Sequence, residues 1–217
     1  MKPAPIALFV YRRPDHARRT IEALRNNELA ADSDLIVYSD GPKTAADAAQ
    51  VAEVRALLAK VTGFRNVNLV TREHNCGLAQ SIISGVSETV ATRGKVIVLE
   101  EDMVTARYFL RYMNEALDLY EQDEEVISIH GYVYPVEGTL PETFFLRGAD
   151  CWGWATWKRG WDLFEPDGRK LLSELRQRGL ERDFDFDGAT DYTRLLRGQI
   201  AGRNNSWAVR WYASAFL

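Results

Sequence analysis

The chain has 217 residues, of which 46% are hydrophobic and 27% charged, and its formal net charge is −4. This length and composition allow one globular domain with a sizeable core of its own. A dedicated nucleic-acid binder usually has a basic face, and the acidic balance argues against such a partner. The two cysteines, Cys76 and Cys151, are too few for a disulfide framework and predict a reducing compartment.

The apolar run near the N-terminus, residues 6–11, is far shorter than the roughly 20 residues that a membrane span needs. No small-residue cleavage site follows it, so it does not read as a signal peptide. The sequence therefore predicts a cytoplasmic protein, and it leaves peripheral membrane contact open.

Hydrophobic periodicity predicts four strand–helix units in succession. The strands are expected at 5–10, 35–38, 67–70 and 95–99, and the helices from Pro14, over 46–61, from Leu78 and from Phe109. This alternation predicts an α/β fold, a Rossmann-like, mostly parallel sheet with helices on both faces. Ligands of such sheets bind beyond the carboxyl ends of the strands. Polar clusters follow three of the predicted strands, at 11–13, 39–41 and 100–102.

The pattern changes near residue 125, where 126–130 and 144–146 are predicted to add strands to the sheet. All six tryptophans follow residue 150, in the second half of the chain. Because they are confined to one half, we do not expect all of them to be core residues. We expect one domain over 1–217, with a nucleotide-binding half at 1–122 and an acceptor-binding half at 123–217. Ser206 is the predicted N-cap of a last, apolar helix. That helix ends at Leu217 without a C-cap signal, so we expect a C-terminally truncated chain.

Three consecutive carboxylates, Glu100, Glu101 and Asp102, follow the buried strand 95–99 directly. Like charges repel one another, and their removal from water costs several kcal/mol each. A divalent cation would relieve both penalties, and hard oxygen ligands suit Mn²⁺ or Mg²⁺. The alternative is a solvated turn whose acids favour the start of the next helix.

Around these acids the chain reads VIVLEEDMVTARYFLRYMNEAL, from Val96 to Leu117. This segment resembles the acidic strand end and following helix of N-acetylglucosaminyltransferase I-like enzymes and of bacterial family 2-like glycosyltransferases. Those enzymes are inverting transferases of the GT-A fold, and some act in polysaccharide biosynthesis. The resemblance implies that Asp102 binds the metal and that Glu101 faces hydroxyls of the donor. It also implies a UDP-sugar donor, with N-acetylglucosamine favoured, and a saccharide or glycolipid acceptor.

The same resemblance implies further donor-binding residues. Arg12, preferred over its neighbour Arg13, would contact the phosphates, for which guanidinium is well suited. Asp40 would accept from the ring N–H of the base, and Asn75 and Gly77 would lie beside the nucleotide. The alternatives are a surface arginine for Arg12 and ordinary turn residues for the others.

Gly153 and Trp154 match the segment that in the family lies under the donor sugar and the acceptor. Aromatic faces stack on the apolar faces of sugar rings, as their amphipathic character allows. The alternative is that the tryptophans form a core.

An inverting transfer needs a general base for the acceptor hydroxyl. The resemblance implies an aspartate where a late helix begins, and Asp191 is the match, with Asp187 and Asp185 as rivals. Asp191 could instead serve only as a helix cap.

Two other classes of function stay open. A sugar-1-phosphate nucleotidyltransferase uses a similar sheet, although residues 8–20 contain no glycine for its phosphate loop. A non-catalytic domain that binds a nucleotide sugar or a saccharide is the other. The three histidines show no metal-ligand spacing.

Overall fold

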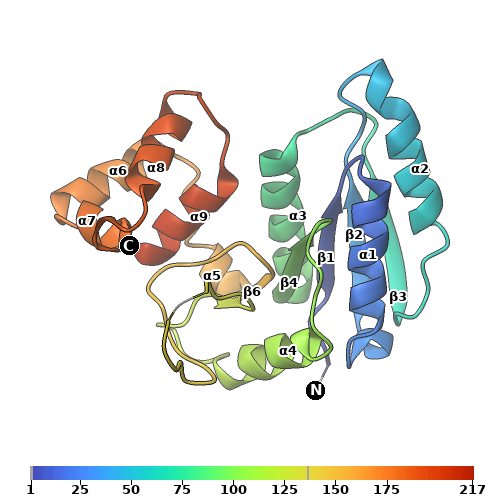
Figure 1. Cartoon of the computed structure of the whole chain (residues 1–217), viewed down its shortest axis with the longest axis horizontal. Helices are drawn as coiled ribbons and strands as arrows, with labels where there is room; N and C mark the ends of the chain where they lie inside the picture. Colours follow the sequence, from blue (N-terminus) through green and yellow to red (C-terminus); the bar gives the residue numbers. More distant parts are fainter. Residues whose placement is uncertain (1, 136) are drawn as a thin grey trace.

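The computed structural model describes residues 2–135 and 137–217, in which six strands form one sheet in the order β3-β2-β1-β4-β6-β5 (Figure 1). The strands are β1 (Ile6–Val10), β2 (Asp34–Ser39), β3 (Asn66–Thr71), β4 (Lys95–Glu100), β5 (Ile129–His130) and β6 (Trp154–Trp157). The α-helices are α1 (Pro14–Arg25), α2 (Ala48–Leu58), α3 (Leu78–Arg93), α4 (Phe109–Leu119), α5 (Lys158–Trp161), α6 (Gly168–Gln177), α7 (Glu181–Phe184), α8 (Tyr192–Ile200) and α9 (Trp207–Phe216).

The strands β1 to β4 are mutually parallel, and β6 runs antiparallel to both β4 and β5. The α/β class and the mostly parallel sheet predicted from the sequence are therefore confirmed. From β1 the chain builds outward through β2 and β3, and it then returns to place β4 on the other side of β1. The strand order reverses between β1 and β4, and open α/β sheets bind their ligands at such a point.

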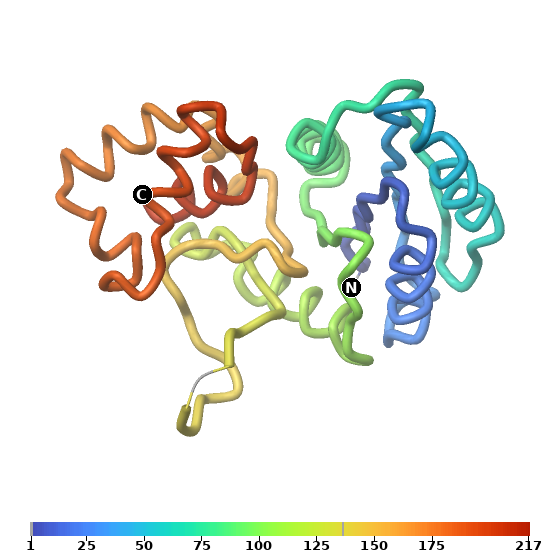
Figure 2. Tube along the Cα trace, turned by 45° about the horizontal axis from the view of Figure 1, so that its top comes forward, coloured from blue at the N-terminus to red at the C-terminus, as the bar shows by residue number. Residues whose placement is uncertain are grey.

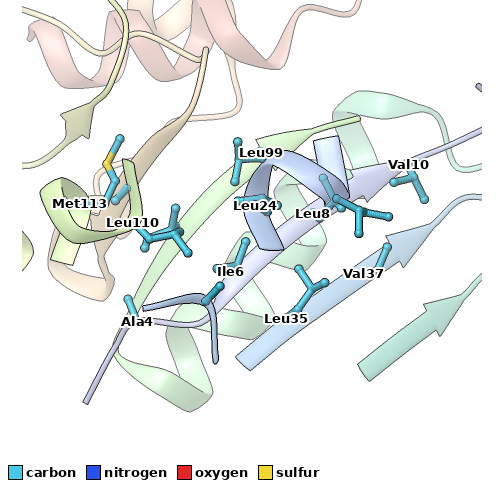
Figure 3. Close-up of a cluster of buried hydrophobic side chains, with 14 of the residues drawn as sticks. Ala4, Ile6, Leu8, Val10, Leu24, Leu35, Val37, Leu99, Leu110 and Met113 are labelled. Carbon is cyan, nitrogen blue, oxygen red and sulfur yellow. The ribbon is translucent and has the colours of Figure 1, made fainter. Parts of the chain in front are cut away.

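Helices cover both faces of the sheet, which explains why β1 is a continuous apolar run. On one face, α1, α2 and α4 pack against Ile6, Leu8 and Val10 of β1. Figure 3 shows these side chains with Leu24 of α1 and Leu99 of β4 in one buried cluster. On the other face, α3, α5 and α9 pack against the alternate side chains of β1, because successive side chains of a strand point to opposite faces.

A helical lobe formed by α6, α7, α8 and one side of α9 lies apart from the strands β1 to β3 (Figures 1 and 2). It has a core of its own, which includes Leu175, Phe184 and Leu196. Helix α9 joins this lobe to the sheet, because Tyr212 packs into the core of the lobe while Trp211 packs against the sheet. The predicted N-cap is confirmed, since Ser206 Oγ accepts from the Val209 N–H at 3.2 Å.

Two predictions for the second half were wrong. Residues 144–146 are not a strand: they lie in an irregular segment, where Phe145 is 67% exposed. Of 126–130, only Ile129 and His130 are extended. The strand that does complete the sheet is β6, which pairs with β4 from Lys95 to Val98. Its sequence, WATW, is buried on both faces and so has no polar alternation to mark it as a strand.

Candidate functional site

The acid triplet lies where the sheet reverses its order. Glu100 closes β4 and is in register with Phe9 of β1. The chain leaves β1 beside it, which places Arg13 next to the acids. Arg13 Nε donates to Glu101 Oε1 at 2.9 Å, and Arg13 Nη2 donates to Asp102 Oδ2 at 2.9 Å. Thr20 of α1 donates to the Glu101 carbonyl at 2.6 Å, which fixes the backbone of the turn that follows β4.

The triplet carries more negative charge than its surroundings neutralise. Burial, followed by the charges of Asp102 and Glu101, raises the pKa of Glu100 to about 7, and Arg13 opposes this only in part. The Glu101 side chain is 7% exposed, whereas the Asp102 side chain is 41% exposed. A cation at this place would therefore meet the accessible carboxylate of Asp102 beside the half-buried Glu100 and the buried Glu101.

The acid triplet fits a hard divalent cation if further oxygen ligands complete the coordination. All the side-chain donors of the triplet are carboxylate oxygens, which suit Mg²⁺ and Mn²⁺. Over residues 2–135 and 137–217, however, no three His, Cys, Asp or Glu side chains converge to hold an ion by themselves. A cation at Asp102 would need further oxygens from water or from a bound substrate, and Mg²⁺ in proteins commonly keeps several waters and takes phosphate oxygens.

A cavity of about 430 Å³ lies over the carboxyl ends of β1 and β2 and the start of α3. We call it the nucleotide-side cavity, after the prediction that its lining residues bind the donor. Five of the predicted donor-binding residues line it although they come from four separate parts of the chain: Arg12, Asp40, Asn75, Gly77 and Glu101. The structure thus brings together in one place residues that the sequence could only place at separate strand ends.

Asp40 organises this cavity from inside the protein. Its Oδ1 accepts from the N–H groups of Gly41 and Cys76, and its Oδ2 accepts from the Gly77 N–H and the Asn75 amide, each at 2.9 Å. Four donors match the hydrogen-bonding capacity of a carboxylate. In this structure Asp40 fixes the loop before α3, and its contact with a base stays a prediction.

The two adjacent arginines have different partners. Arg12 is paired with Asp47, which also accepts from the Tyr11 hydroxyl at 3.0 Å and from the Thr44 hydroxyl at 3.0 Å. Arg13 is the arginine that contacts the acid triplet. Both arginines line the nucleotide-side cavity, so a phosphate contact by Arg12 stays a prediction, and Arg13 is a second candidate.

A second cavity, of about 870 Å³, adjoins the triplet through Glu100 and Asp102. We call it the acceptor-side cavity, after the prediction that the second half of the chain binds the acceptor. Asp102 lines it, and Glu100 lines both cavities. Its walls come from the loop before α4, the end of β5 and the loop before β6, and they are rich in aromatic side chains. These include Tyr108, Phe109, Tyr112, Tyr132, Phe144 and Trp152.

The tryptophan prediction needs a correction. Trp154 is fully buried in β6 and packs among Trp161, Trp207 and Trp211, so it has no face to offer a ligand. Five of the six tryptophans are buried in the core, so the alternative that the tryptophans form a core is correct for these five. The exposed tryptophan is Trp152, with 49% of its surface accessible, and it lines the acceptor-side cavity.

Gly153 does line the acceptor-side cavity, as a predicted site residue would. Its φ of +75° is one that L side chains rarely adopt, and an added Cβ would lie 3.1 Å from the Phe109 ring. Glycine therefore lets the chain turn from the exposed Trp152 into the buried strand β6.

The candidate general bases lie in the helical lobe. Asp191 caps α8, where its Oδ1 accepts from the Arg194 N–H at 3.1 Å. Asp187 is exposed and pairs with Arg182 at 3.2 Å, and Asp185 accepts from the Thr193 N–H at 2.7 Å. None of the three lines either cavity in the described part of the chain. Asp191 and Asp187 therefore lie outside the lining of the two cavities, and Asp191 does cap α8 as the alternative expected, so their role as general base stays a prediction.

Sequence reasoning passed over His130, which ends β5 and lines the acceptor-side cavity. Burial lowers the pKa of its imidazole, against an opposing effect of Asp150. Its Nδ1 is buried without a hydrogen-bond partner among the residues that the structure describes. A single histidine at a strand end forms no sequence motif, so nothing in the sequence indicated a role for His130. Its position in the wall of the acceptor-side cavity is what makes it a candidate site residue.

The sequence matches no known protein family. It also matches no curated protein. Among solved structures, one similar chain is the mannosyltransferase PcManGT of Pyrobaculum calidifontis in complex with GDP-Man and Mn²⁺, at 14% identity and a TM-score of 0.42 over 59% of this chain and 36% of that one. Another is TarS of S. aureus, at 13% identity and a TM-score of 0.43 over 67% of this chain and 24% of that one.

This chain thus spans about a third and about a quarter of those two structures. At such identities and TM-scores the likeness is too weak to assign an activity. Among the described helices, none is both long and apolar enough to cross a membrane.

Proposed function

We propose that the protein is a metal-dependent glycosyltransferase of the GT-A type, which moves a sugar from a UDP-sugar donor to a saccharide or glycolipid acceptor. One observation carries the proposal. Two cavities meet at the acid triplet, at the point where the sheet reverses its order, and Glu100 lines both. A transfer between two substrates needs such a junction, because the donor and the acceptor must meet at one reacting carbon.

In this proposal the nucleotide-side cavity takes the nucleoside diphosphate. Asp40 holds the Cys76 and Gly77 N–H groups and the Asn75 amide in place, so the loop is preorganised before the donor arrives. Arg12 and Arg13 line the same cavity and are suited to phosphate oxygens. Asp102 would hold Mn²⁺ or Mg²⁺, and the metal would supply Lewis-acid stabilisation of the departing diphosphate.

The acceptor-side cavity supports a saccharide as the acceptor. Trp152 contacts Tyr132 and Tyr134, with ring centroids 4.8 and 5.9 Å away, and so has a fixed orientation. An exposed, fixed indole is a suitable platform for the apolar face of a sugar ring. N-acetylglucosamine as the transferred sugar and the inverting outcome rest on the sequence resemblance alone.

A general base for the acceptor hydroxyl must lie on the acceptor side of the triplet. Asp191 and Asp187 line neither cavity, whereas His130 lines the acceptor side. Burial lowers the pKa of its imidazole, which keeps the ring neutral but also weakens it as a proton acceptor. That neither predicted aspartate lines a cavity also favours a second candidate function, a non-catalytic domain that binds a nucleotide sugar.

Replacement of Asp102 tests the proposal. We expect wild-type protein to release UDP from a UDP-sugar in the presence of a saccharide acceptor, with Mn²⁺ and not with EDTA. Asp102→Asn keeps the shape of the side chain but removes its charge, so turnover should fall by about 100-fold or more, the usual scale for a lost electrostatic contribution. The measurement is UDP release from a panel of UDP-hexoses and UDP-N-acetylhexosamines.

The matched control is Asp162→Asn, which removes an exposed carboxylate that pairs with Lys158 and lines neither cavity. It should leave turnover unchanged. Equal turnover in Asp102→Asn and wild type would remove the metal role. Binding of UDP and Mn²⁺ without any transfer would favour the non-catalytic domain, and pyrophosphate release from UTP and a sugar phosphate would favour a nucleotidyltransferase.

A further inference from the structure

Arg13 places its positive charge between the carboxylates of Glu101 and Asp102, where a metal cation would also be attracted. Arg13 lies in the segment between β1 and α1, directly before the first residue of α1. Its guanidinium donates to the carboxylates of both Glu101 and Asp102, at 2.9 Å each. A planar guanidinium offers donors in a fixed fork, so one arginine can bridge two neighbouring carboxylates. In the described part of the chain no other basic side chain pairs with either acid.

The two partners of Arg13 differ in exposure. Glu101 is almost fully buried, whereas the Asp102 and Arg13 side chains are 41% and 44% exposed. The contact with Glu101 therefore anchors the guanidinium, and the contact with Asp102 is the one open to solvent and to substrates. Asp102 faces the acceptor-side cavity, and Arg13 and Glu101 face the nucleotide-side cavity.

A divalent cation on Asp102 and a guanidinium on the same carboxylate repel each other. Arg13 can pair instead with an oxygen of a diphosphate, because it already lines the cavity proposed for the nucleotide. Cation and diphosphate together therefore satisfy both Asp102 and Arg13, whereas the cation alone leaves Arg13 displaced or repelled.

We propose that Arg13 is a positioning residue that occupies Asp102 in the cation-free protein and releases it when the cation and a nucleoside diphosphate bind together. Arg13 then weakens binding of the cation alone and couples it to the nucleotide. Coupling of this kind is reciprocal, so each ligand raises the affinity for the other. The inference rests on the proposed function for the identity of the nucleotide but not for the role of Arg13 toward the cation.

The test is a titration of the full chain with Mn²⁺, followed by the electron paramagnetic resonance signal of free Mn²⁺, with and without UDP. Without UDP, Arg13→Gln should bind Mn²⁺ about tenfold more tightly than wild type, a typical size for a coupling between sites. With UDP the advantage should disappear, since the variant loses the group that links the two ligands. Arg13→Lys keeps the charge without the fork and should lie between the two.

Arg18→Gln is the matched control, because Arg18 lies on α1, is 49% exposed and pairs with Asp15 rather than with the triplet. It should bind Mn²⁺ as wild type does. Circular dichroism of each variant establishes that it is folded. Equal or weaker Mn²⁺ binding by folded Arg13→Gln and Arg13→Lys in the UDP-free arm would overturn the inference. Failure of UDP to affect wild type would instead remove the proposed donor, while the UDP-free comparison still decides the role of Arg13.

Discussion

Neighbouring residues of the same type have different environments in this protein. Arg12 pairs with Asp47 and Arg13 with the acid triplet, although the two are adjacent in sequence. Trp152 is half exposed beside a cavity, and Trp154, two residues later, is fully buried. In each pair the residue type is compatible with either role, and the path of the chain just after β1 or just before β6 decides between them.

The tryptophan pair makes a direct prediction. Trp154→Ala removes a fully buried indole and should lower the free energy of unfolding by about 3 to 5 kcal/mol, because a cavity remains. Trp152→Ala should cost less than about 1 kcal/mol, since that side chain is largely at the surface. Urea unfolding of the two variants measures both values.

Trp152→Ala should also raise the KM for the saccharide acceptor while the KM for the donor stays the same. Steady-state kinetics with each substrate varied in turn separates the two constants. An unchanged acceptor KM, or a Trp152→Ala variant as unstable as Trp154→Ala, would contradict the assignment of Trp152 to the ligand side.

At the scale of elements, the start of β2 is fixed by an ion pair. Arg65 donates to both oxygens of Asp34 at 2.9 and 2.6 Å, and Asn66 donates to one of them at 2.7 Å. The hydrogen bonds from Arg65, helped by Asn66 and the charge of Arg93 and opposed by burial, lower the pKa of Asp34 from 3.8 to about 2. This pair ties the edge strand β3 to β2.

The lowered pKa of Asp34 predicts a pH dependence of stability. A carboxyl whose pKa is lower in the folded state stabilises the protein when ionised, and the contribution is lost as the pH falls from about 4 to about 2. Asp34→Asn should therefore be less stable than wild type by about 1 to 2 kcal/mol at pH 7, after allowance for solvent screening. The difference should shrink toward pH 2.

Thermal unfolding of wild type and Asp34→Asn at a series of pH values measures this difference. Asp15→Asn serves as the control, because its carboxylate is 80% exposed and forms only a surface pair with Arg18. A gap between wild type and Asp34→Asn that is constant from pH 7 to pH 2 would show that the ionised carboxylate is not the cause.

At the scale of the whole molecule, the proposed site belongs to the junction of the sheet and its flanking loops, and not to the helical lobe. The two cavities share Glu100, whereas α6 to α8 pack around a separate core. The division into a nucleotide half at 1–122 and an acceptor half at 123–217 remains a proposal, in which the loops before α4 and before β6 jointly form the acceptor wall.

Hydrogen exchange measures this arrangement. UDP with Mn²⁺ should slow amide exchange at 10–13, 75–81 and 99–103, which line the nucleotide-side cavity or flank its lining residues, and leave α6 and α8 unchanged. Bound ligand protects the backbone that it orders, while the separate core of the lobe is not involved. Protection confined to α6–α8 would place the ligand elsewhere.

The amino-acid sequence by itself determined the first four strand–helix units of the fold, because strands buried on both faces and amphipathic helices have distinct periodicities. It also indicated the acid triplet and the polar strand ends at 11–13 and 39–41, since turn residues after a buried strand are visible locally. It misplaced the strands after residue 125, where β6 consists of a few large apolar residues that read equally well as core.

Only the tertiary structure decided which of these residues meet. The reversal of strand order between β1 and β4 puts Arg13 on Glu101 and Asp102, 88 and 89 residues away in the chain. The four donors on Asp40 and the burial of Trp154 likewise depend on contacts between distant segments. Local periodicity reports which face of an element is apolar, but it contains no information about the partner that covers that face.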